Sequence, residues 1–136
     1  MDYFHIALPA DQLRTVSSIG LAHVGDGVYE LYVRSRILSE RENLPAYALH
    51  KAAVHYVSAS AQSRSIAAIE DKLTERELAV YKRGRNAKSP TVPKNADVGD
   101  YRRATGFEAL LGCLYIDGEQ KRLDEIMQAA FDAAEK

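Results

Sequence analysis

Cysteine and tryptophan are almost missing from this sequence, which has one cysteine and no tryptophan in 136 residues. Cys113 has no partner for an internal disulfide, and its apolar neighbours predict a small buried side chain rather than a reactive thiol. No segment approaches the roughly 18 uncharged apolar residues of a membrane span, and the first residues lack the basic start and apolar core of a signal peptide. We therefore expect a cytoplasmic protein without a membrane-spanning segment.

Zinc and nucleotide motifs are missing as well. The spacings CxxC and HExxH do not occur, which disfavours zinc. The tripeptide Gly25-Asp26-Gly27 lacks the additional residues of a phosphate-binding loop. Because glycine carries no side chain, the tripeptide instead predicts a helix that a neighbouring element approaches closely.

Apolar residues make up 46% of the chain and recur at helical spacing, while patterns typical of strands are nearly absent. The length fits one domain with its own core. We therefore predict an all-α fold in which residues 1–136 form a single domain. Ser17 and Ser18 fit a helix cap, and Thr74 and Glu77 fit a capping box. The expected helices cover about residues 19–39, 46–57, 62–73, 74–84, 104–116 and 123–131, with a kink or short break at 58–61.

Two of these helices carry one acidic residue each in an otherwise apolar run. Asp26 lies within LAHVGDGVYELYV, and Glu108 lies within ATGFEALLGCLYI. A helix that is apolar all round is typically buried, so we expect Asp26 to lie in a buried stripe with Tyr29. Two central helices that each present one carboxylate form a simple scaffold for a divalent cation bound through oxygen. The pair is therefore the predicted metal site.

Each carboxylate also has a structural explanation when it is taken alone. Asp26 fits a helix residue solvated at a groove, and Glu108 fits a backbone cap or a partner of Arg34 or Arg103. Glu30, one turn from Asp26, fits an exposed partner of Arg34 at i+4 as well as a residue that supports the metal site. Because both carboxylates lie alone in the middle of an apolar helix, we favour the metal site.

Basic residues concentrate in one segment of the chain. Residues 82–103 contain seven basic and two acidic side chains, although the net charge of the whole chain is −1. Residues 85–96 contain two prolines and no helical periodicity, which predicts a long exposed loop. The segment fits either a solvated surface or a site for RNA. The predicted RNA-binding residues, which suit phosphates and ribose hydroxyls, are Arg83, Arg85, Asn86, Lys88, Lys94 and Asn95.

The motifs around the two carboxylates resemble a known family. LAHVGDGVYELYVR resembles the LGDxV signature of the ribonuclease III catalytic domain, and TGFEALLGCLYIDG resembles the FEALxGxxYLDxG motif of that family. LHKAAVHYVSASAQ, KRGRNAKS and PKNADVGDYRRATGFEALLG resemble its mini-ribonuclease III branch, which lacks a double-stranded-RNA-binding domain. The resemblance covers about residues 17–130.

This resemblance implies an activity. It implies a homodimeric endoribonuclease that uses Mg²⁺, with Mn²⁺ as a substitute, to cleave double-stranded RNA and leave a 5′ phosphate. Asp26 and Glu108 then take the positions of the catalytic carboxylates that bind the metal. The implied substrate is the precursor of the large-subunit (23S-type) ribosomal RNA, and whether a large-subunit ribosomal protein presents this RNA stays open.

Two positions depart from full-length ribonuclease III. Ala22 stands where that family has a Glu four residues before the signature Asp, and Thr105 stands where it has an Asp three residues before the Glu. The mini branch shares both departures, which leave the number of bound metal ions open. We expect Thr105 to orient a metal-bound water. Glu30 is a candidate for supporting the metal site from outside its ligands, although the exposed ion pair with Arg34 fits it better.

A further position bears on the dimer. His23 aligns with an aromatic residue that, in ribonuclease III, fills a socket on the partner subunit. An exposed turn of a helix is the alternative setting for this histidine.

Two other functions fit an all-α chain of this kind. A non-catalytic helical RNA-binding factor of ribosome assembly is the main alternative, and the presence of both Asp26 and Glu108 argues against it. A helical metal phosphohydrolase would need a His-Asp dyad, which we do not find.

Overall fold

The computed structural model describes residues 4–88 and 92–135. These residues contain helices and no strand, which confirms the predicted all-α fold. No helix within them is long and apolar enough to cross a lipid bilayer. The helices are α1 (Ala10–Leu13), α2 (Ser18–Glu40), α3 (Ala46–Val57), α4 (Ala59–Ile69), the 3₁₀ helix η1 (Glu70–Lys72), α5 (Glu75–Asn86), α6 (Val98–Ile116) and α7 (Gln120–Glu135).

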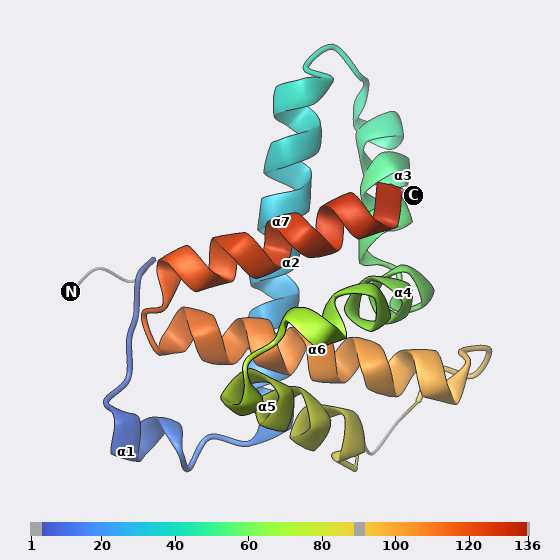
Figure 1. Ribbon diagram of the computed structural model, residues 1–136. Helices are drawn as coiled ribbons and strands as arrows, with labels where there is room; N and C mark the ends of the chain where they lie inside the picture. The colour runs from blue at the N-terminus through green and yellow to red at the C-terminus, as the bar shows by residue number, and fades with distance from the viewer. Residues whose placement is uncertain (1–3, 89–91, 136) are drawn as a thin grey trace.

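Helix α6 runs through the middle of the molecule and packs against α2, α4, α5 and α7 (Figure 1). The C-terminal half of α2 leaves this body and forms a projecting hairpin with α3 (Figure 1). Both helices that carry the predicted metal ligands therefore meet in the centre of the fold.

Local side-chain caps set several helix ends. Ser17 accepts a hydrogen bond from the backbone N–H of Gly20 at 2.9 Å, which confirms the predicted start of α2. The predicted capping box of Thr74 and Glu77 is present at the start of α5. Helix α6 begins at Val98, earlier than the predicted Ala104, because the side chain of Asp97 caps it.

The predicted helix over residues 62–73 has different bounds. Ser58 has an extended backbone and caps the next helix by accepting from the N–H of Ala61, so α4 already begins at Ala59. The helix ends at Ile69, and Glu70–Lys72 tighten into the 3₁₀ turn. The break that we predicted for residues 58–61 is therefore confined to Ser58.

Two helix crossings are made by glycines. A Cβ atom on Gly25 would overlap the carbonyl of Glu108, and one on Gly112 would overlap the carbonyl of Leu21, so α2 and α6 touch through their backbones. Where α5 crosses α6, a Cβ on Gly84 would lie 2.9 Å from the Cα of Gly106. The close approach predicted for the glycine tripeptide is thus confirmed at Gly25.

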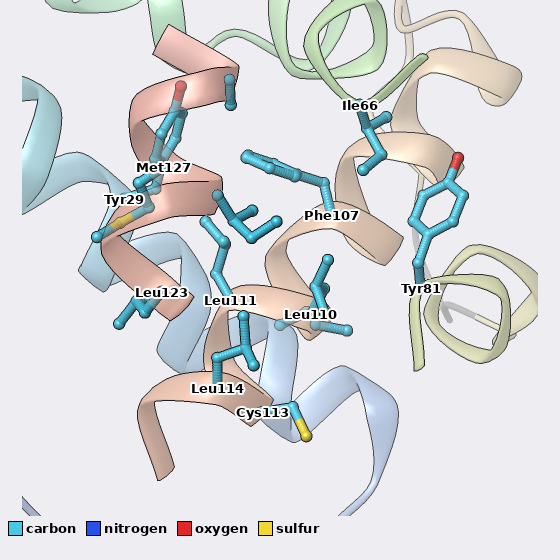
Figure 2. Packing of buried hydrophobic residues seen from close by; sticks show 14 of the residues in the cluster. Tyr29, Ile66, Tyr81, Phe107, Leu110, Leu111, Cys113, Leu114, Leu123 and Met127 are labelled. Atoms are coloured by element: carbon cyan, nitrogen blue, oxygen red, sulfur yellow. The ribbon is translucent and has the colours of Figure 1, made fainter. Parts of the chain in front are cut away.

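The core is built around α6 and α7. Figure 2 shows Phe107, Leu110, Leu111 and Leu114 of α6 among residues of the neighbouring helices. The ring of Phe107 meets that of Tyr29 edge to face, with 5.1 Å between the ring centres. Cys113 is a free, buried thiol that belongs to the same core, as the sequence predicts.

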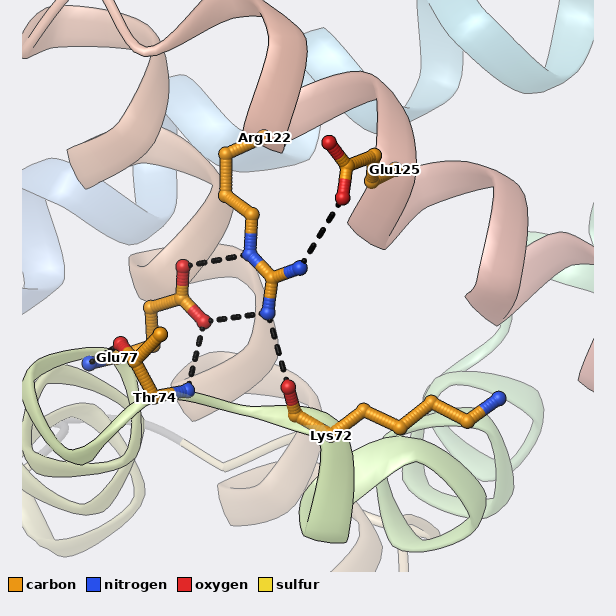
Figure 3. Close-up of polar contacts among 5 residues, drawn as sticks. All are labelled: Lys72, Thr74, Glu77, Arg122 and Glu125. Atoms are coloured by element: carbon orange, nitrogen blue, oxygen red, sulfur yellow. Dashed lines mark hydrogen bonds and ion pairs between the residues drawn. The ribbon is translucent and has the colours of Figure 1, made fainter.

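An ion pair joins α5 to α7. Arg122 of α7 donates to both carboxylate oxygens of Glu77 at 2.8 and 2.9 Å, and it also donates to the carbonyl of Lys72 (Figure 3). Glu77 therefore caps α5 and binds α7 with the same carboxylate.

Candidate active site

Asp26 and Glu108 come together at the crossing of α2 and α6. Gly25, the neighbour of Asp26, lies against the backbone of Glu108, so the two helices bring the carboxyl groups into hydrogen-bonding contact. The contact joins residues that are far apart in the sequence. We predicted it because each carboxylate lies alone in the middle of an apolar helix.

The pKa of Glu108 reports this crowding of acidic groups. Burial, and after it the hydrogen bond and the charge of Asp26, raise the pKa of this carboxyl to about 8. The charge of Glu30 acts in the same direction, whereas a hydrogen bond from Gln62 lowers the pKa. A bound cation would favour the ionised form of Glu108, because it offsets the repulsion between the carboxylates.

The predicted burial of Asp26 is wrong. Helix α2 buries the face that holds Tyr29, but Asp26 itself is exposed. Helix α2 is also not covered all round, because Leu31, which the apolar pattern led us to expect inside, is 51% exposed. The alternative of a solvated Asp26 describes its surroundings better.

Glu30 and Thr105 make other contacts in the described residues. Glu30 forms the expected exposed ion pair with Arg34, at 3.0 Å. The hydroxyl of Thr105 donates to the carbonyl of Tyr101 in its own helix, at 3.0 Å. Arg103 binds Asp100 and the hydroxyl of Ser63.

Neither arginine that we considered for Glu108 is paired with it. Arg34 is held by Glu30, and Arg103 is held by Asp100, so the structure gives Glu108 no arginine partner among the described residues. This removes the ion-pair explanation of Glu108 and leaves its carboxyl group facing that of Asp26.

Gln62 is a residue of the site that the sequence analysis missed. Its side-chain N–H group donates to a carboxylate oxygen of Glu108, at 3.4 Å, from a position that is only 1% exposed. A single glutamine carries no signal in the sequence that would distinguish it from a surface residue, because the contact joins residues 46 positions apart.

The donor set suits a hard cation. Among residues 4–88 and 92–135, no group of three or more His, Cys, Asp and Glu side chains could share a metal ion, so the pair of carboxylates is the available protein ligand set. Oxygen ligands in small number suit Mg²⁺, which keeps several of its waters. The residues present therefore fit the metal that the sequence predicts.

The predicted RNA-binding residues lie on two sides of α5 and in the loop after it. The guanidinium of Arg85 lies over the ring of Tyr81, 5.6 Å from its centre, and donates to the side chain of Asn86. Arg83 instead lines a groove between α1, α5 and α6 that also includes Leu13. The exposed side chains are Arg83, Asn86, Lys88, Lys94 and Asn95. Residues 89–91 of this loop lie outside the described residues.

His23 is exposed on α2. Large apolar side chains are exposed on the same helix, at 38% for Ile19 and 51% for Leu31. The contact of His23 with a partner subunit therefore stays a prediction.

Comparisons with known proteins agree with this geometry. The family described as Ribonuclease III domain matches residues 20–119. Proteins named Mini-ribonuclease 3 are similar: that of Thermoanaerobacter is 45% identical over 95% of this chain and 90% of its own length, and that of Brevibacillus brevis is 49% identical over 85% of each. A crystal structure of a Fusobacterium nucleatum protein, 28% identical, covers 89% of this chain and 96% of its own with a TM-score of 0.79.

Proposed function

This chain belongs to the ribonuclease III domain family and is an endoribonuclease of that type, and from this premise we propose that it cleaves double-stranded RNA with Mg²⁺ held by Asp26 and Glu108. The observation that carries the proposal is the meeting of these two carboxylates where α2 and α6 cross. The double-stranded substrate and the metal follow from the family resemblance and from the oxygen ligands of the site.

The chemistry of RNA hydrolysis explains why such a site needs a cation. Attack on a phosphodiester adds negative charge to a group that is already negative, and a bound Mg²⁺ supplies charge stabilisation and an activated water. Asp26 and Glu108 would hold such a cation by their charge. Because Glu108 is partly buried and Asp26 is exposed, Glu108 fixes the site to the core and Asp26 faces the solvent from which RNA arrives.

The RNA-binding surface that we propose includes the exposed basic residues after α5. Lys88 and Lys94 are exposed, and Arg85 is held in place by Tyr81 and Asn86. Double-stranded RNA is recognised mainly through its shape, phosphates and 2′-hydroxyls, for which such side chains are suited.

We also propose that the active form is a homodimer. Helix α2 leaves Ile19, Leu31 and Leu38 exposed on the same helix as His23, and a second copy would remove these apolar side chains from water. The two sites of a dimer would each cut one strand of a duplex, leaving 5′ phosphates.

The precursor of 23S-type ribosomal RNA, in the cytoplasm, is the substrate that we propose from the likeness to Mini-ribonuclease 3 proteins. Whether a large-subunit ribosomal protein has to present it is decided by comparing free precursor RNA with its ribosomal particle. Mapping the ends that the protein produces in total precursor RNA identifies the substrate.

The test of the proposed activity is cleavage of a plain RNA duplex. We expect cleavage with Mg²⁺ or Mn²⁺, none after chelation, and 5′-phosphate ends on the products. Binding of the duplex without cleavage at any metal concentration would instead support the non-catalytic assembly factor.

A further inference from the structure

Gln62 links three helices through one side chain. It lies in the first turn of α4, its side-chain nitrogen donates to the carbonyl of Val57 in α3 at 3.0 Å, and the same nitrogen donates to Glu108 of α6 at 3.4 Å. The side chain is 1% exposed, so water does not compete for these contacts.

The break between α3 and α4 explains the first of these bonds. In a continuous helix the carbonyl of Val57 would accept from the N–H of Ala61. The extended backbone of Ser58 prevents this, and the N–H of Ala61 binds the hydroxyl of Ser58 instead. The side chain of Gln62 thus supplies the donor that the last carbonyl of α3 would otherwise lack.

This carbonyl also fixes which end of the amide faces Glu108. A carbonyl only accepts hydrogen bonds, so the nitrogen of Gln62 has to point toward Val57. The reverse orientation would place the amide oxygen of Gln62 against the carbonyl of Val57 and the carboxylate of Glu108, both of which are acceptors. The backbone therefore holds an N–H donor against Glu108.

The other end of the amide has no partner. The oxygen Oε1 of Gln62 is buried and accepts no hydrogen bond from the described residues. An unpaired buried acceptor destabilises a fold, and an apolar side chain of similar length would avoid this cost but would leave the carbonyl of Val57 without its donor. The contact with Glu108 gives this unfavourable glutamine a function.

We propose that Gln62 is a positioning residue for Glu108, which fixes one carboxylate oxygen so that the group is held beside Asp26, ready for a divalent cation. The inference rests on the metal site proposed above. A glutamate side chain has three rotatable bonds, and a hydrogen bond to one oxygen removes much of that freedom before the metal binds. Removing such an outer hydrogen bond typically weakens metal binding by about 10-fold to 100-fold.

The test measures metal binding without RNA. Mn²⁺ binding is followed by electron paramagnetic resonance for the wild type, Gln62→Leu and Gln62→Met, and thermal unfolding is recorded without metal. We expect both variants to bind Mn²⁺ about 10-fold or more weakly. Their melting temperatures should stay near that of the wild type, because the loss of the donor to Val57 and the removal of the unpaired Oε1 oppose each other. A purely structural role of Gln62 would give the opposite pattern, with lower melting temperatures and unchanged Mn²⁺ affinity.

Ser65→Ala is the matched control. Ser65 is as buried as Gln62 and lies on the same helix, but its hydroxyl donates to the carbonyl of Ala130 in α7. We expect this variant to keep its Mn²⁺ affinity. An equal loss of affinity in Ser65→Ala and Gln62→Leu would show a general effect of disturbing α4 and overturn the proposal.

Two further measurements separate the ways in which the proposal can fail. If the wild type does not bind Mn²⁺, the proposed metal site itself is wrong; if Asp26→Asn abolishes binding and the Gln62 variants retain it, only the positioning role is wrong. In the unmodified protein, Mg²⁺ should shift the side-chain amide resonances of Gln62 and not those of the exposed Gln128. An unchanged Gln62 signal at saturating Mg²⁺ contradicts the proposal even if the variants fail to fold.

Discussion

Gly25 and Gly112 face each other where α2 crosses α6: a Cβ on Gly25 would lie 2.9 Å from the nitrogen of Gly112, and one on Gly112 would lie 3.1 Å from the nitrogen of Gly25. The distance between the two helices is therefore set by backbone atoms. Asp26 follows Gly25 directly, and Glu108 lies one turn before Gly112, so this contact also sets how near the two carboxylates come.

Substitution of Gly25 by alanine should separate the helices. The added methyl group overlaps the carbonyl of Glu108, and such overpacking costs about 1–3 kcal/mol or more of the unfolding free energy. Gly27→Ala is the control, because nothing lies within 4 Å of its Cβ position. Alanine there should be neutral or stabilising by about 0.5–1 kcal/mol, since it favours the helix. Urea unfolding of both variants, in the same oligomeric state, measures the difference in the free energy of unfolding. An equal loss of stability in Gly25→Ala and Gly27→Ala would contradict the close contact.

Removal of either carboxylate should abolish most of the activity. Asp26→Asn and Glu108→Gln keep the side-chain size but remove the charge that holds the cation, so single-turnover cleavage of a duplex should fall by orders of magnitude while RNA affinity persists. Asp124→Asn, which removes an exposed charge on α7, should cleave normally. Near-normal Mg²⁺-dependent cleavage by either site variant would end the assignment.

The end of α5 and the loop after it should contribute to RNA affinity through their charge. Alanine at Arg83, Arg85, Lys88 or Lys94 should lower the slope of log K against log salt by about one unit for each side chain that binds a phosphate. The maximal cleavage rate should change less. Lys121→Ala, at an exposed position on α7, serves as the control. Unchanged affinity and slope in the quadruple alanine variant would show that these residues form only a solvated surface.

His23 should lie at the contact between two copies of the chain. An aspartate there would place a charge in each of the two symmetric contacts, so His23→Asp should shift the protein toward monomer. Sedimentation velocity of the wild type and of His23→Asp at pH 7.5 measures this shift. His50→Asp, at an exposed position on α3, is the control and should leave the dimer unchanged. If His23→Asp leaves the dimer as intact as His50→Asp does, His23 does not fill a socket on the partner subunit.

Glu77 should make stability depend on pH in acid. The hydrogen bonds from Arg122 lower the pKa of its carboxyl below the usual 4.5. Because the folded pKa is the lower one, its contribution is complete above about pH 4.5 and is lost as the pH falls through the folded value. Glu77→Gln should lower the free energy of unfolding by about 1.5–3 kcal/mol at pH 7, and this difference from the wild type should shrink below pH 4.5.

Glu125→Gln tests the same arginine from the other side. Glu125 binds Arg122 at 3.3 Å but is 52% exposed, so its loss should cost about 0–1 kcal/mol. Chemical denaturation at several pH values measures both variants. Equal costs for the two glutamates would contradict the special position of Glu77.

The sequence predicted what is set locally and missed what depends on packing. Thr74 and Glu77 are three residues apart, so the capping box could be recognised directly. The joint site of Asp26 and Glu108 followed from their similar settings and from the family motifs. The exposure of Asp26 did not follow, because an apolar helix does not reveal which of its faces the fold covers. Gln62 and Arg122 were missed since their partners lie 46 and 45 positions away.

The crossing of Gly84 and Gly106 has a genetic consequence. Every amino acid other than glycine carries a Cβ atom, and at these two positions it would press into Ala109, Gly106 or the backbone of Tyr81. Every missense mutation at either codon therefore produces the overlap. A random mutagenesis screen for abolished cleavage should return hits at both glycines, although neither carries a side chain that could bind metal or RNA.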